Sequence, residues 1–175
     1  VPTDLAEGSF TVDAASSDGS GNSASVSGSG SIDTIAPLLT VNDPGTGNDN
    51  TPTITGSGEV GAVVTVIVTD SLGNTQTIET VVDADGNYSI DVPDALADGE
   101  YTVTVTAEDN AGNTSTQTVT AEVNSAAPTL TLDPPGLGND ATPTLTGTGE
   151  VGATVTLTIT DANGATQTVT TTVDG

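Results

Sequence analysis

The sequence predicts an all-β fold built from tandem β-sandwiches, and three observations lead to this prediction. The stretch TPTITGSGEVGA at 51–62 returns as TPTLTGTGEVGA at 142–153, an offset of 91 residues. Without a gap, residues 128–175 match residues 37–84 at 29 of 48 positions, so the copies share one fold. Runs of Val, Ile and Thr alternate apolar and polar residues, and Gly-, Asn- and Asp-rich turn signals separate them roughly every 8–12 residues.

The 91-residue offset predicts one complete repeat and two partial repeats. LAEGSFTV at 5–12 matches LADGEYTV at 96–103, so the offset also holds near the start. Gly and Ser are abundant before residue 32, and a linker is the alternative interpretation of that segment. The alternation of Phe10, Val12, Val26 and Ile32 favours a weak repeat instead. We expect the C-terminal part of one repeat at 1–36, a complete repeat at 37–127 and the N-terminal half of a third at 128–175.

The first half of the complete repeat contains three predicted strands. Leu39 and Val41 alternate in the first, and the loop NDPGTGNDNTP follows. A short second strand lies around 54–56 and ends at the turn GEVG. The third strand, 64–68, places Val at every second position, and the third repeat has Val155, Leu157 and Ile159 at the matching positions.

The second half of the complete repeat contains four more predicted strands. They are separated by the turns DSLGN, DADGN and DNAGN, with a longer connection through PDALADG. Each carries apolar residues at alternate positions. Seven short antiparallel strands in about 90 residues are typical of an immunoglobulin-like sandwich. The four strands lie at 78–82, 88–92, 101–107 and 119–123.

The charge balance excludes several classes of function. The chain has 24 acidic residues and no Lys, Arg, His or Cys. Without basic side chains it cannot neutralise the phosphates of nucleic acids or anionic lipids. The usual catalytic bases and activated nucleophiles are absent as well, so we expect no enzymatic activity. No run of 18 apolar residues occurs, and we expect no membrane insertion in this segment.

The acidic residues predict a divalent cation at the ends of the domains. If the strands run up and down, alternate loops lie at opposite ends of the sandwich. The end that faces the preceding domain then collects carboxylates from the linker and from three loops. Because like charges repel, such a cluster favours a hard cation with oxygen ligands, and we expect Ca²⁺. The candidate ligands are Asp33, Glu59, Asp83, Asp85 and Asp109, with Glu150 and Asp174 at the second junction.

Two further features of the sequence bear on the predicted cation sites. Each Asp, taken singly, is also an ordinary turn former. At the second junction Asn124 occupies the position that Asp33 holds at the first, so a site there should bind the ion more weakly.

The combination of TPTITGSGEVGA with LADGEYTVTVTAEDNAGNTS resembles the bacterial Ig-like repeats of giant calcium-dependent surface adhesins, of the biofilm-associated and repeats-in-toxin type. The resemblance implies an extracellular stalk of many similar domains, stiffened by Ca²⁺ between neighbouring repeats of the same chain. Such a stalk holds an adhesive tip away from the bacterial cell. The GGxGxD nonapeptide of the wider protein type does not occur in this sequence.

A stalk segment in adhesion and biofilm formation is therefore the expected function, at the bacterial cell surface or in a secreted protein. Two alternatives remain open. Residues 1–35 supply two strands of a sandwich and residues 128–175 supply four, so copies could complete each other in an extracellular filament or surface layer. The other alternative is a glycan-binding module, which needs an aromatic platform from a chain with two Tyr and one Phe.

Overall fold

The computed structural model describes residues 3–175, so residues 1 and 2 of the first predicted repeat lie outside it. The described part contains eleven strands and no helix, hence none long and apolar enough to cross a membrane. The chain divides into two compact units, 1–125 and 126–175. The strands are β1 (Gly8–Ser17), β2 (Ser23–Ile32), β3 (Thr46–Gly47), β4 (Thr53–Ser57), β5 (Val63–Thr69), β6 (Thr75–Val81), β7 (Asn87–Asp91), β8 (Gly99–Glu108), β9 (Thr114–Val123), β10 (Thr154–Thr160) and β11 (Thr166–Thr172).

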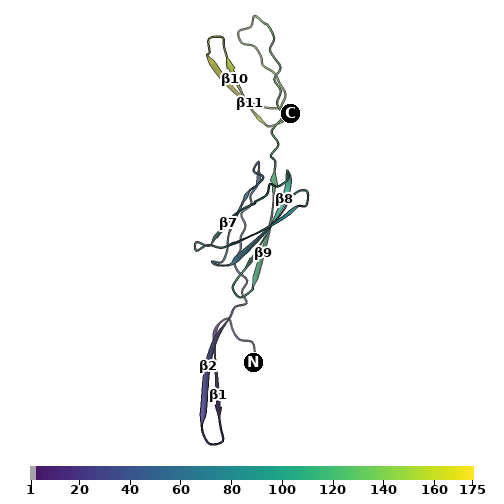
Figure 1. Cartoon of the computed structure of the whole chain (residues 1–175). Coiled ribbons are helices and arrows are strands. Elements are labelled where there is room, and N and C mark those ends of the chain that lie inside the picture. The colour runs from purple at the N-terminus through teal and green to yellow at the C-terminus, as the bar shows by residue number, and fades with distance from the viewer. Residues whose placement is uncertain (1–2) are drawn as a thin grey trace. The chain divides into compact units, whose positions relative to one another are not determined.

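The complete repeat is a two-layer sandwich, which confirms the predicted all-β class (Figure 1). One layer is a five-stranded sheet in the order β3-β9-β8-β5-β6. The other pairs β4 with β7, and residues 39–42 extend it beside β4 through backbone hydrogen bonds from Thr40 N to Ser57 O and from Asn42 N to Thr55 O. Six of the seven predicted strands are present as β4 to β9, and the first, around Leu39 and Val41, is reduced to an isolated bridge between Leu39 and Gly58.

The order of the strands differs from the up-and-down arrangement expected from the sequence. The chain changes layer after β4, after β6 and after β7, and β5 pairs with β8 rather than with β4. An up-and-down order keeps sequence neighbours side by side, whereas this sandwich buries the apolar faces of two separate sheets against each other. Successive strands still reverse direction, so alternate loops lie at opposite ends as expected.

A second difference is the short strand β3, inside the segment expected to be a loop. Thr46 and Gly47 pair in parallel with Glu122 and Val123 of β9. The Gly and Pro residues around them favour a loop. However, the carbonyl oxygens of Gly45 and Gly47 accept the N–H groups of Glu122 in β9 and of Asn124, which follows β9. The segment therefore covers the edge of the five-stranded sheet.

The core lies between the two layers and follows the period-two pattern. Val64, Val66 and Val68 of β5 and Val103 and Val105 of β8 are all 0% exposed. Burying a Val side chain fully stabilises a fold by about 1.5–3 kcal/mol. The outward positions of the same strands are mainly Thr, which packs well on a pleated surface and remains soluble.

The partial repeats keep the register of the complete one. In β1–β2 Gly8 pairs with Ile32, and 91 residues later Gly99 pairs with Val123 in β8–β9. In β10–β11 Thr154 pairs with Thr172, which matches Val63 and Val81 in β5–β6. Residues 8–32 therefore form a hairpin with the register of β8–β9.

Candidate metal centre at one end of the complete repeat

Three loops and the entering linker meet at the end of the sandwich that contains Pro37. Gly58 N donates to Gly86 O at 3.0 Å, which joins the first loop to the second. The linker is bound by Asn113 Nδ2, which donates to Asp33 O at 3.2 Å, and by Ser115 Oγ, which donates to Pro37 O. The predicted pole is therefore a real feature of the fold. Its loops span residues 58–62, 82–87 and 109–113.

Asp109 is the most buried of the predicted ligands, at 9% exposure. Its Oδ1 accepts the N–H groups of Ala111 at 2.8 Å and Asn113 at 2.9 Å, and its Oδ2 accepts Asn113 Nδ2 at 2.9 Å. These bonds, with the Asn113 amide as the largest contribution, hold the pKa of Asp109 below its ordinary value against the opposing effect of burial. Both oxygens of this carboxylate thus stabilise the turn.

The same turn chemistry recurs along the chain. Five turns between successive strands begin with an Asp whose Oδ1 accepts the N–H groups two and four residues later. In each turn a Gly three residues after the Asp has a positive φ between 81° and 90°. The turn-former interpretation therefore applies to both Asp83 and Asp109. The five residues are Asp18, Asp70, Asp83, Asp109 and Asp161.

The other candidates at this pole are exposed. The carboxylate of Asp33 accepts the N–H group of Ile35 in its own linker, at 3.1 Å. Glu59 and Asp85 point their carboxylates to solvent from the first and second loops. Across residues 3–175, no three carboxylates lie close enough together to hold one metal ion. The chemistry of the donor set fits a hard cation, because it is composed of oxygen ligands and contains no basic side chain. The ligand assignment remains a prediction.

In the unit 126–175, the two remaining candidates are also exposed. Glu150 N donates to Thr129 O at 3.2 Å, which repeats the bond from Glu59 to Leu38. Asp174 lines a groove together with Leu, Val and Thr side chains. The bond of Glu150 involves only its backbone, and Asp174 only lines the groove. The role of both residues as ligands therefore remains a prediction.

The sequence interpretation missed the contribution of Asn113 and Ser115 to the linker contact. The sequence predicts a turn at Asn113, and it gives Ser115 no role beyond that of the other hydroxyl residues of the strands. The repeated spacing in the sequence does indicate that the Asn113 side chain has a structural role. Asn22 and Asn74 also follow an Asp by four residues, and the Nδ2 group of each donates to the carboxylate of that Asp. Nothing in the sequence distinguishes Ser115.

At the opposite end of the sandwich, carboxylates also act within the fold. Asp70 is 7% exposed and accepts the N–H groups of Leu72 and Asn74, and Asn74 contributes most to lowering the Asp70 pKa. Asp98 accepts Ser125 N and Ser125 Oγ, which lowers the Asp98 pKa. The two bonds between Asp98 and Ser125 attach the outgoing chain to the domain, as the bond from Asn113 to Asp33 attaches the incoming chain.

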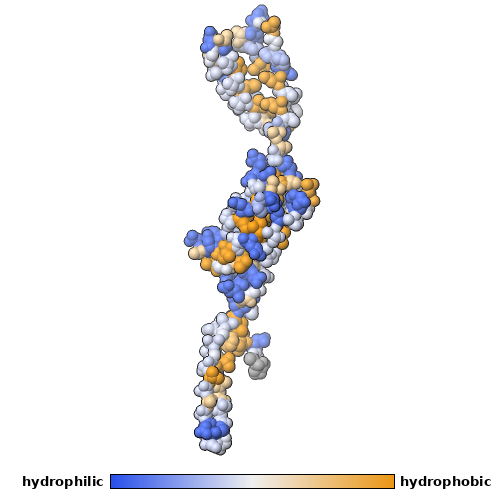
Figure 2. Space-filling view, viewed as in Figure 1, coloured by the Kyte–Doolittle hydropathy of each residue, from blue (hydrophilic) through white to orange (hydrophobic). Residues whose placement is uncertain are grey.

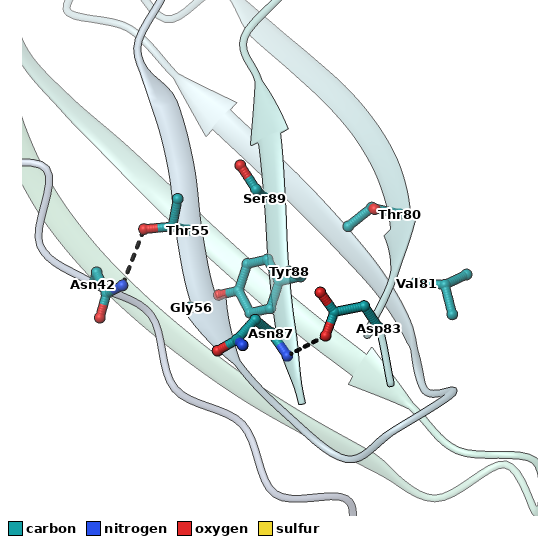
Figure 3. Close-up of a pocket in the computed structure, with 9 residues that line it drawn as sticks. All are labelled: Asn42, Thr55, Gly56, Thr80, Val81, Asp83, Asn87, Tyr88 and Ser89. Carbon is teal, nitrogen blue, oxygen red and sulfur yellow. Dashed lines mark hydrogen bonds between the residues drawn. The ribbon is translucent and has the colours of Figure 1, made fainter. Parts of the chain in front are cut away.

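The surface groove beside β7 provides no aromatic platform (Figure 3). Tyr88 lies at its base with only 3% exposure, and its hydroxyl donates to Thr40 O at 2.8 Å. Burial raises the pKa of Tyr88 to about 12. Tyr101 is 2% exposed, and its pKa is raised by burial and then by Asp43 and Asp49. Neither ring can stack on a sugar, which weighs against the glycan-binding alternative.

Comparison with known proteins agrees with this architecture. Residues 40–125 match the family model of the bacterial Ig-like domain. The chain is similar to a crystal structure of a tetra-tandem repeat in the extending region of a large adhesion protein, with 35% identity and a TM-score of 0.52. That alignment covers 97% of this chain and 46% of the other, so this chain spans less than half of its relative.

Two further similarities are weaker. CopC from Methylosinus trichosporium OB3b has 18% identity and a TM-score of 0.39 over 50% of this chain and 94% of that one. A Ca²⁺-stabilized adhesin that helps an Antarctic bacterium reach out and bind ice has 23% identity and a TM-score of 0.35, over 95% of this chain and 56% of that one. No curated protein matches the chain significantly. The family model therefore assigns the complete repeat, residues 40–125, to the bacterial Ig-like domain, and the hairpins β1–β2 and β10–β11 keep the strand register of that repeat.

Proposed function

We propose that this chain is a spacer segment in the stalk of a large extracellular bacterial adhesin. The observation that supports this most is the linker at 33–37, which is hydrogen-bonded to loops of the domain that follows. A chain of sandwiches whose linkers are short and bound in this way extends rather than collapses. The tetra-tandem repeat that it resembles comes from the extending region of an adhesion protein, which supports the same role.

The dimensions of the sandwich suit a spacer. Strands β8 and β9 have ten residues each, which corresponds to about 33 Å at about 3.3 Å per residue. With the linker entering at one end and leaving at the other, each repeat adds nearly this full length to the array. An adhesin built this way serves cell adhesion and biofilm formation from the cell surface or as a secreted protein.

We further propose that Ca²⁺ stiffens the array by binding at the domain ends. The exposed carboxylates of Asp33, Glu59 and Asp85 are the free ligands at the end of the complete repeat. Asp83 and Asp109 mainly position the loops, and Glu150 and Asp174 are the corresponding residues of the next repeat. A bound cation supplies positive charge that the chain lacks entirely, and it reduces the repulsion within a molecule of net charge −24.

Thermal unfolding with and without Ca²⁺ tests the metal proposal. Both tyrosines lie in the core of the complete repeat, so tyrosine fluorescence reports the unfolding of this domain. A ligand that binds only the folded state at 100 times its Kd stabilises it by about 2.7 kcal/mol. We expect Ca²⁺ to raise Tm, and Glu59→Gln to remove most of that increase.

The control is Glu79→Gln, which removes one exposed carboxylate from the outer face of β6. It should leave the Ca²⁺ effect intact, because β6 contributes no candidate ligand. An equal rise in Tm for both variants would mean that Ca²⁺ acts by general screening and not at this end of the domain.

A further inference from the structure

The chain enters and leaves the complete repeat at opposite ends of the ladder between β8 and β9. Ser115, near the start of β9, donates through its Oγ to Pro37 O in the entering linker. Ser125, two residues beyond the end of β9, donates to the carboxylate of Asp98, which directly precedes β8. The ten residue pairs of the β8–β9 ladder lie between these two contacts. Tension on an array of such repeats therefore pulls the domain along its strands.

The short strand β3 joins the first part of the domain to its last strand. Thr46 and Gly47 pair in parallel with β9. Glu122 N donates to Gly45 O at 3.2 Å, and Asn124 N donates to Gly47 O at 2.8 Å. Both residues of β3 are exposed, and the end of the domain at which they lie is covered mainly by hydrophilic residues in Figure 2. Backbone hydrogen bonds, and not buried apolar side chains, therefore hold β3 in place.

The parallel direction of β3 and β9 determines how tension acts on these bonds. Tension pulls the entering chain, which leads into β3, in one direction, and it pulls the end of β9 in the opposite direction. The two strands then have to slide past each other along their length. The hydrogen bonds of a ladder run across from strand to strand, so sliding strains all of them together and not one after another.

We propose that the β3–β9 pair is the mechanical clamp of the repeat, meaning the contact that must break before tension can unfold the domain. Residues 39–42 are pulled in the same way, and they are bound to β4 through Thr40 N and Asn42 N. Their release alone leaves both sheets joined, because β3 still holds the chain to β9. The proposal rests on the stalk role only as the source of the tension.

The sequence before β3 fixes the backbone that forms the clamp. Asp43 Oδ1 accepts Gly45 N at 2.8 Å across Pro44, whose ring restricts its own φ. Gly45 has a φ of 70°, in the left-handed region, and a Cβ added there meets no atom within 4 Å. Substitution of Gly45 by Ala therefore adds backbone strain without steric overlap, and the strain disappears once the segment detaches.

Constant-force stretching of the 175-residue chain between handles at its two ends, in chelator, tests the clamp. The unfolding step of the complete repeat is identified by its length, because each residue that it releases adds up to about 3.5 Å. We expect Gly45→Ala to speed this step about 5- to 30-fold. Gly73→Ala is the matched control, since Gly73 has a φ of 85° and equally open space but lies in the β5–β6 turn. It should leave the rate under force unchanged.

A second pair of variants removes one hydrogen bond of the clamp directly. Glu122→Pro lacks the N–H group that donates to Gly45 O. Thr118→Pro is its control. In an antiparallel ladder, N–H groups four residues apart point to the same side, and Thr118 lies outside the two residues of β9 that pair with β3. We expect Glu122→Pro to speed the step roughly fivefold and Thr118→Pro to leave it unchanged.

Val66→Ala separates the clamp from general stability. It should lower the free energy of unfolding in urea, but its core contacts are still formed when β3 detaches, so the rate under force should stay that of the unmodified chain. Equal rates for Gly45→Ala and Gly73→Ala, or a larger acceleration by Val66→Ala than by Gly45→Ala, would overturn the proposal. The handles supply the tension and chelator removes Ca²⁺, so either result leaves the stalk role and the Ca²⁺ proposal to their own tests.

Discussion

At the scale of single residues, the acidic side chains perform two different tasks. Asp70 and Asp109 are nearly buried, and their oxygens are used by N–H groups of their own turns. Asp33, Glu59 and Asp85 are exposed and remain free for a cation. Residue type does not distinguish these tasks, whereas the sequence context does. An Asp followed by Gly three residues later and Asn four residues later is a turn residue first.

Substitution of Asp109 tests this division through its pH dependence. The pKa of Asp109 is lower in the folded than in the unfolded chain. Its contribution to stability is therefore full above the unfolded pKa and is lost as the pH falls through the folded pKa. We expect Asp109→Asn to lower the free energy of unfolding at neutral pH, and the gap to the unmodified chain to close in acid. Urea unfolding at a series of pH values measures this gap.

Glu79→Gln is the matched control for this experiment, since it removes one charge without touching a turn. A gap between Asp109→Asn and the unmodified chain that stays constant down to acid pH would show that the carboxylate is not what stabilises the turn.

Gly56 tests the packing around the buried tyrosine. A Cβ at this position would overlap Thr40 O and the Tyr88 hydroxyl, which lies across the strand pair. Overpacking of this kind typically costs about 1–3 kcal/mol. We expect Gly56→Ala to lower the free energy of unfolding by that amount, as measured by tyrosine fluorescence in urea. Gly47→Ala, where the nearest atom is 3.9 Å away, should change it by less than about 0.5 kcal/mol.

At the scale of strands, sequence periodicity predicted which residues form the core but not which strands are neighbours. The alternation of Val64, Val66 and Val68 identified the buried face of β5 correctly. The pairing of β5 with β8 depends on contacts between residues 33–45 positions apart, which a local pattern does not encode. The strand β3 escaped prediction for a related reason, because its two residues are held by β9 and not by their own propensity.

A pair of substitutions in β5 compares its two faces. Val66 is 0% exposed in the centre of the core, and Thr65 points outward beside it. Val66→Ala removes two buried methyl groups and leaves a cavity, so we expect a loss of about 2 kcal/mol. Thr65→Ala should cost less than about 1 kcal/mol, since only strand propensity is lost. Equal losses would contradict the assignment of the two faces.

At the scale of the whole chain, the exact repeat of register is the property that explains the rest. It accounts for the two partial repeats and for the loops that meet at the domain end. The candidate site was predictable as a place, because loop alternation fixes which loops share an end. Its individual ligands were less predictable, because hydrogen bonds within the turns compete for the same oxygens.

Small-angle X-ray scattering of the chain, in Ca²⁺ and then in chelator, tests the central claim most directly. A stalk stiffened by Ca²⁺ should show a larger maximum dimension and radius of gyration in Ca²⁺ than in chelator. Identical scattering curves in the two solutions, together with an unchanged Tm, would contradict it.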